Sequence, residues 1–263
     1  MMTHTFPSLF STYRQASLLW AKTFVDLLPF LLLWMLSQVG LELFLPQTDQ
    51  ISALFFVTLF LDMAITALFF GVILNGLYQR YRENKFDFMT TLTGCKRFIP
   101  LYIAYTLVSL PMLLVLFAFG GLLHFGKQMP MTWIMNILSM QHVIIACAAF
   151  LTLILAVMFF IAGVFIVINK NGAFKALKHS YQLVKQYWMD TLLVILLFGI
   201  MATFASFLLE ELQIPYTKAL ITLLFSSFYP ALMIIHYENL VQHSKQIDVN
   251  VIAQQTDQKF RQV

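Results

Sequence analysis

Six long apolar runs, separated by polar segments, constrain the fold of this chain more than any other feature. Of its 263 residues, 60% are hydrophobic and only 11% are charged, whereas soluble domains carry roughly 25% charged residues. So few charges cannot cover that much apolar surface in water, and each run is long enough for a helix that crosses a bilayer. The sequence therefore predicts an all-α, polytopic membrane protein. The predicted spans cover about 23–45, 51–77, 99–123, 142–168, 191–209 and 217–237, in one domain of residues 1–240 that a polar tail of residues 241–263 follows.

The positions of the basic residues predict how these spans are oriented. Taken alternately, the segments outside the spans carry 14 Lys and Arg on one side and 2 on the other. By the positive-inside rule, the side with 14 faces the cytoplasm and includes both ends of the chain. The net charge of +4 is then a sign of orientation and of contact with anionic lipid in the cytoplasmic leaflet, and it does not indicate nucleic-acid binding.

The stretch 169–190, between the fourth and fifth spans, has the pattern of an amphipathic helix. Its apolar residues recur at spacings of three and four, and they are Phe174, Leu177, Tyr181, Val184 and Trp188. Lys175, Lys178 and Lys185 flank this face. The pattern is typical of a helix in the membrane interface, with apolar groups and Trp188 in the lipid and lysines at the headgroups. A solvated helix that packs on its own protein is the alternative. Residues 1–22 are a weaker candidate of the same kind.

A weak internal repeat accompanies these cytoplasmic segments. A basic residue followed by an aromatic one stands before three of the spans, at Lys22-Thr23-Phe24, Lys96-Arg97-Phe98 and Lys185-Gln186-Tyr187. Any interfacial anchor has this composition. The pattern is therefore compatible with three two-span units without establishing them.

Asp62, near the centre of the second predicted span, is the sharpest candidate for a functional side chain. A carboxylate at that depth costs roughly 2.5–3.5 kcal/mol on insertion scales, so it should face protein or water. The other members of this predicted intramembrane polar site are Thr58, Thr66, Ser109, Ser226 and Ser227. Such a site could bind a proton or a cation. The alternative is a protonated carboxyl group that holds helices together through hydrogen bonds.

Other chemistry has little support in the sequence. Pro111 and Pro230 each remove a backbone donor inside a span, as at some transporter sites and in many ordinary bundles. Cys95 and Cys147 have no metal-type spacing, and no nucleophile elbow or phosphate-binding loop is present. We therefore predict no catalytic residue, no metal site and no cofactor.

Residues 172–200 resemble a stretch in six-span bacterial inner-membrane proteins of the YciC kind and in the membrane domain attached to some glycerophosphodiester phosphodiesterases. The residues that fit are Gly172, Phe174, Ala176, Leu177, Lys178, Ser180, Leu183 and Trp188. The six-span layout fits over nearly the whole chain. The resemblance implies a bacterial inner-membrane protein and brings no catalytic residues, because the phosphodiesterase chemistry belongs to a separate soluble domain.

Two functions follow as expectations. The first is a non-enzymatic inner-membrane protein that acts in membrane or envelope homeostasis, through lipids, partner membrane proteins or a second copy of itself. The second is a small transporter or lipid-translocating protein that uses Asp62.

Overall fold

The computed structural model describes the backbone of residues 9–44, 53–125, 139–211 and 217–260. The prediction of an all-α fold is confirmed, because every regular element in these ranges is a helix. The long helices are α1 (Leu9–Phe44), α2 (Ala53–Glu83), α4 (Phe98–Phe125), α6 (Gln141–Met158), α9 (Trp188–Glu211) and α10 (Thr217–Phe260). The short ones are α3 (Phe88–Leu92), η1 (Thr93–Arg97), α7 (Ala162–Val167), α8 (Ala173–Val184) and η3 (Lys185–Tyr187).

Five stretches of the described residues are long and apolar enough to cross a bilayer. They are Leu9–Leu41, Leu54–Glu83, Phe88–Phe119, Gln141–Met158 and Ala173–Leu208. The predicted sixth span lies in α10, whose side chains are described from Leu223 to Ser244. The helical character of a multi-pass membrane protein is thus present in the structure.

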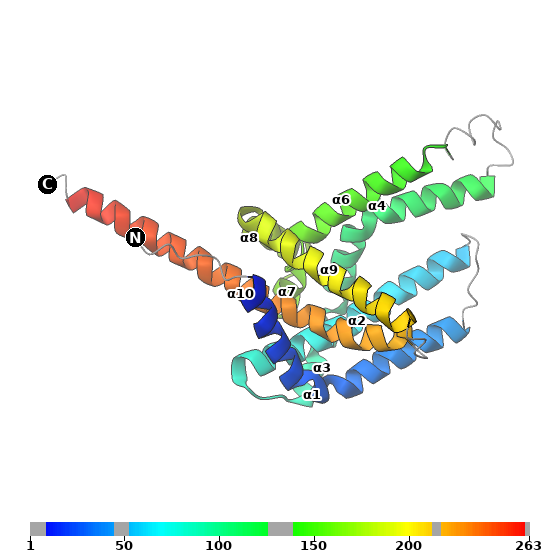
Figure 1. The fold of residues 1–263 in the computed structure, drawn as a ribbon, viewed down its shortest axis with the longest axis horizontal. Helices are drawn as coiled ribbons and strands as arrows, with labels where there is room; N and C mark the ends of the chain where they lie inside the picture. Colours follow the sequence, from blue (N-terminus) through cyan, green and yellow to red (C-terminus); the bar gives the residue numbers. More distant parts are fainter. Residues whose placement is uncertain (1–8, 45–52, 126–138, 212–216, 261–263) are drawn as a thin grey trace.

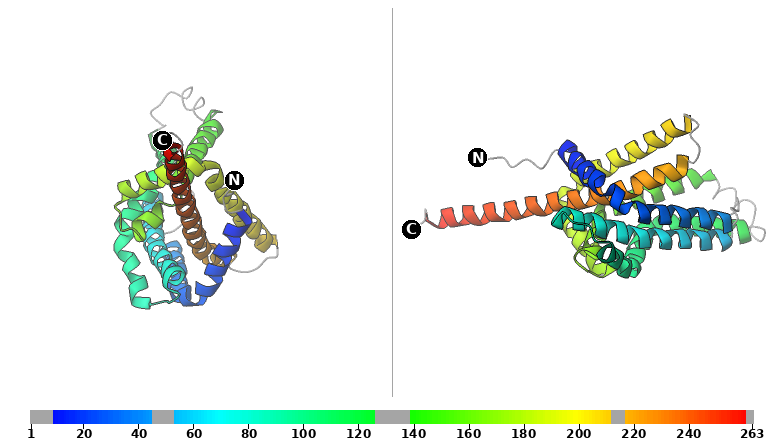
Figure 2. Two further views of the ribbon diagram at one scale, coloured as in Figure 1. Left: turned by 90° about the vertical axis from the view of Figure 1, so that its left-hand side faces the viewer. Right: turned by 90° about the horizontal axis from the view of Figure 1, so that it is seen from below.

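Helices that follow one another in the sequence pack as pairs. Figure 1 shows α1 beside α2, α4 beside α6, and α9 beside α10. The short helices α3 and α8 both lie toward the same end of the bundle, which we call the inner end (Figure 1). The long helix α10 leaves the bundle at the inner end and extends well past the other helices (Figures 1 and 2).

The first half of α1 turns back at the inner end instead of forming a separate interfacial helix. Figure 1 shows a bend in α1, and the helix contains Pro29, which cannot donate the backbone hydrogen bond of its turn. Residues 9–22 pack on α9 and α10. The Tyr13 hydroxyl donates to the Val194 carbonyl at 2.7 Å, and the Trp20 indole donates to the Ser227 hydroxyl at 2.9 Å.

The buried core is concentrated in the inner half of the bundle. Among its largest fully buried side chains are Leu74 of α2, Leu101 of α4, Ile166 of α7 and Leu232 of α10. Apolar side chains in α6 and α9 are instead exposed, such as Phe150 at 65% and Phe204 at 60%. Exposed apolar surface of this extent on long helices is what contact with lipid requires.

Polar side chains attach α3 and η1 to the end of α2. The Asn75 amide donates to the Thr90 carbonyl at 2.7 Å, and the Gln79 carbonyl oxygen accepts from the Asp87 N–H at 3.3 Å. Asp87 also caps α3, since its carboxylate accepts from the hydroxyl and the N–H of Thr90. These donations, the hydroxyl first, lower the pKa of Asp87. The cap is therefore at full strength with the carboxylate ionised and weakens as pH falls through that lowered pKa.

Candidate functional site

The helix α8 has three distinct faces at the inner end of the bundle. One face is buried against the protein and consists of Ala173, Ala176, Leu177, Ser180 and Val184. Beside it, Phe174 and Tyr181 are exposed, at 72% and 47%. At 100° per residue, Lys178 and Lys185 come next around the helix, followed by Lys175. All three lysines are exposed, and none forms an ion pair with the residues that the structure describes.

The apolar face predicted from the sequence is therefore divided between two environments. Leu177 and Val184 pack on the protein, whereas Phe174 and Tyr181 point away from it. The small residues Ala173, Ala176 and Ser180 permit close packing and determine which side of the helix is buried. Trp188, at the start of α9, is half-buried, and its indole N–H lies inside the protein without a hydrogen-bond acceptor among the described residues.

The predicted fourth span, 142–168, is interrupted rather than continuous. α6 ends at Met158, and a turn over 159–161 leads into α7. The Ala162 N–H, which would bond to the Met158 carbonyl in a continuous helix, donates instead to the Phe159 carbonyl at 2.9 Å. The Ser180 hydroxyl of α8 donates to the Met158 carbonyl at 3.0 Å. α8 thereby satisfies a carbonyl that the interruption leaves unpaired.

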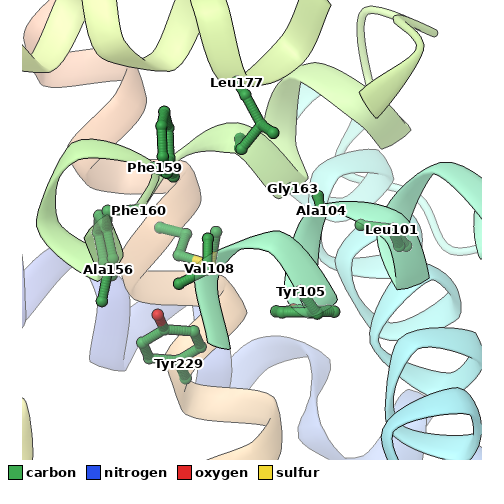
Figure 3. A pocket seen from close by; sticks show the side chains of 12 residues that line it. Leu101, Ala104, Tyr105, Val108, Ala156, Phe159, Phe160, Gly163, Leu177 and Tyr229 are labelled. Carbon is green, nitrogen blue, oxygen red and sulfur yellow. The ribbon is translucent and has the colours of Figure 1, made fainter. Parts of the chain in front are cut away.

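A small apolar cavity of about 70 Å³ adjoins this interruption. Figure 3 shows Leu177 of α8 above it, Phe159 and Phe160 on one side, and Tyr229 of α10 below. The Tyr229 hydroxyl points toward the cavity. The complete lining is Leu101, Ala104, Tyr105, Val108, Ala156, Phe159, Phe160, Ala162, Gly163, Leu177, Tyr229 and Met233.

The side chains predicted to accompany Asp62 do not form hydrogen bonds with it or with one another in the described part of the chain. Thr58 donates to the Leu54 carbonyl of its own helix at 2.9 Å. Ser226 and Ser227 donate to carbonyls one turn earlier in α10, and Ser227 also accepts from Trp20. Thr66 and Ser109 are half-buried, and no hydrogen bond of their hydroxyls is found among the described residues.

The angular position of Asp62 around α2 turns it toward α1 and away from α4, the helix that carries Ser109. Asp62 lies within about 20° of Phe69 around α2, and Phe69 stacks on Trp34 of α1 with ring centroids 6.1 Å apart. The rings of α2 that contact α4, such as Phe70 against Tyr105 at 5.4 Å, lie about 80° or more away from Asp62. Asp62 is thus on the side of α2 that faces α1.

We expect Asp62→Asn to change the free energy of unfolding by no more than about 0.5 kcal/mol. Asp62 is half-buried and has no hydrogen bond or ion pair with a described residue, so the substitution breaks no polar interaction there. Thermal unfolding of the purified protein in detergent would measure the change. A large destabilisation would contradict the prediction and would mean that the carboxylate holds helices together.

Three polar contacts at the inner end, two of them buried, were not apparent from the sequence. The Arg82 guanidinium pairs with the Glu238 carboxylate at 3.0 Å, and the Asn239 amide donates to the Thr12 hydroxyl at 3.1 Å. The Thr191 hydroxyl and the His236 ring nitrogen Nε2 lie 2.9 Å apart. Each pair joins α10 to another helix. The sequence shows only that these polar residues lie close to the ends of predicted spans. It does not show which of them pair with one another.

Comparison with protein families, with curated proteins and with solved structures yields no match for this chain. The functional argument therefore depends on the residues and the geometry described above.

Proposed function

We propose that this chain is a six-span, non-enzymatic membrane protein that binds anionic lipid at its inner end through α8. One observation carries the proposal: α8 exposes Phe174 and Tyr181 directly beside Lys178 and Lys185, while its opposite face is sealed against the bundle. Aromatic rings next to lysines on an exposed helix face suit the boundary between acyl chains and phosphates. The exposed lysines have no carboxylate partner among the described residues, so they remain available to lipid phosphates.

A second element with similar properties supports the proposal. The first turns of α1 bury Tyr13 and Ala16 against the bundle and expose Phe10 at 79%. Arg14 and Lys22 are exposed on the same segment. Both elements lie at the inner end and combine a buried face with exposed apolar and basic groups. This similarity, together with the packing of consecutive helices as pairs, is compatible with a repeat of two-span units.

The proposed setting is the bacterial inner membrane, with both ends of the chain in the cytoplasm. The excess of basic residues on alternate segments supports this orientation, and the cytoplasmic leaflet supplies the anionic headgroups. The resemblance of residues 172–200 to YciC-kind proteins is compatible with the same setting. In that membrane the protein would serve membrane or envelope homeostasis, alone or with partner membrane proteins.

We expect the triple substitution Lys175→Glu, Lys178→Glu and Lys185→Glu to lower the preference for phosphatidylglycerol over phosphatidylcholine by about tenfold or more. Each basic residue near an anionic surface contributes about 1 kcal/mol, and 1.4 kcal/mol corresponds to a factor of ten. The measurement is mass spectrometry of the lipids retained after purification from an equal mixture. Raising the salt concentration should reduce the preference of the native protein, because exposed charges are screened.

The matched control changes Lys127 and Lys218 to Glu, since the sequence assigns these two to the opposite side of the membrane. This variant should keep the native preference. Equal losses in both variants would refute the specific role of α8.

Transport is the second candidate function, and the interrupted fourth span favours it. Helices broken within a membrane line the substrate sites of many transporters, and this interruption lies next to a cavity. An ion-flux assay in proteoliposomes separates the two candidates. Flux that is lost in Asp62→Asn would support transport, and equal flux in liposomes with and without the protein would remove it.

A further inference from the structure

The cavity beside the interrupted fourth span is almost entirely apolar, which limits what it can hold. Apart from Tyr105 and Tyr229, its lining consists of aliphatic side chains, phenylalanines, a methionine and a glycine. Its volume of about 70 Å³ is roughly five times the space that one water needs. An ordered water also needs two to four polar partners. Two tyrosine hydroxyls cannot supply these to several waters, so an apolar occupant fits the cavity better.

One polar group is nevertheless aimed into the cavity. Figure 3 shows the Tyr229 hydroxyl pointing toward the other lining side chains, and this hydroxyl bonds to no described residue. A phenol in this position has a proton to donate and is surrounded by apolar side chains. The preferred occupant is therefore an apolar chain that carries a hydrogen-bond acceptor. The ester end of a phospholipid acyl chain has this combination.

An arginine one helical turn before a lining residue is a candidate partner for the phosphate of such a lipid. Leu177 of α8, a helix at the inner end, lines the cavity (Figure 3). Arg97 precedes Leu101, another lining residue, by about one helical turn. The Arg97 guanidinium donates to the Lys170 carbonyl at 3.4 Å, and it forms no ion pair in the described ranges. An arginine with free donors at this level suits a phosphate.

We infer that the cavity binds the ester end of one acyl chain of an anionic phospholipid, with the ester carbonyl accepting from Tyr229 and the phosphate beside Arg97. The inference rests on the proposed function, because α8 and its lysines bring anionic lipid to this place. The exposed lysines attract anionic headgroups in general. The cavity adds a site that binds one lipid and requires its ester linkage.

The test compares diester with diether phosphatidylglycerol, because the diether lipid lacks the carbonyl groups. We expect native mass spectrometry to detect about threefold to tenfold more retained diester lipid, as for the loss of one hydrogen bond. Tyr229→Phe should abolish this difference. Tyr102→Phe removes a hydroxyl from α4, next to the lining residue Leu101. Because Tyr102 itself does not line the cavity, this variant should preserve the difference. Equal retention of the two lipids by the native protein, or an unchanged difference in Tyr229→Phe, would overturn the inference.

Two further variants separate this inference from the proposed function. Ala156→Phe fills part of the cavity and should reduce tight retention of both lipids, and retention equal to that of the native protein would count against the site. Loss of folding in Ala156→Phe would leave Tyr229→Phe as the decisive variant. The triple lysine variant should lose its preference for phosphatidylglycerol over phosphatidylcholine while keeping the diester preference. If the lysine variant behaves like the native protein but Tyr229→Phe loses the diester difference, the proposed role of α8 fails and the ester site remains.

Discussion

Gly94→Ala is expected to prevent this protein from reaching its native fold, or to destabilise it by more than about 4 kcal/mol. Gly94 of η1 packs directly on the backbone of α2. A Cβ atom at Gly94 would lie 2.7 Å from the carbonyl carbon of Gly71 and 2.9 Å from the Cα atom of Val72. Both obstacles are backbone atoms, so no side-chain rotation can relieve the clash. Yield of monodisperse protein and thermal unfolding in detergent would measure the effect.

Gly199→Ala is the matched control for this substitution. Gly199 lies in the middle of α9, and a Cβ atom there would have no heavy atom within 4 Å. Alanine is favoured over glycine inside a helix by about 1 kcal/mol. The control should therefore unfold at the same temperature as the native protein or slightly above it. If Gly94→Ala behaved like Gly199→Ala, the close approach of η1 to α2 would be wrong.

Ser180→Ala is expected to destabilise the protein by about 1–3 kcal/mol, because it leaves a buried carbonyl without its donor. Ser180 is fully buried, and its hydroxyl bonds to the Met158 carbonyl, whose helical partner has moved to Phe159. Hydrogen exchange should also become faster at the turn over 159–161. Thermal unfolding together with exchange mass spectrometry would measure both effects.

Ser206→Ala provides the comparison, since it makes the same change of side chain in α9. Among the described residues, the Ser206 hydroxyl donates only to the Ala202 carbonyl of its own helix. Its removal should change the unfolding free energy by no more than about 0.5 kcal/mol. Equal effects in the two serine variants would show that α8 does not support the interrupted span.

The helical fold and its membrane character could be predicted from the sequence because they depend on composition and on long periodic runs. The lysines that the sequence places beside the apolar face, Lys175, Lys178 and Lys185, are exposed and lie outside the buried face in the structure. The rotation of α8 could not be predicted. It depends on Ala176 and Ser180, whose small size matters only once the surface opposite them is known.

The interruption of the fourth span could not be predicted for a related reason. Proline is the usual local signal for a broken helix, yet Pro111 and Pro230 lie inside continuous helices. The break at 159–161 contains no proline, and its freed carbonyl is satisfied by a serine 22 residues further along the chain. The cavity and the candidate lipid site are formed by tertiary contacts of this kind. A local sequence pattern does not predict such contacts.

The concentration of the core at the inner end has a mechanical consequence. Helix segments with exposed apolar surfaces, such as those around Phe150 and Phe204, would pack largely against acyl chains in a bilayer. A thinner or more fluid bilayer would therefore alter the spacing of the helix pairs while the inner half kept its structure. The distance between the helix pairs would then depend on the bilayer, whereas the buried inner core would stay unchanged.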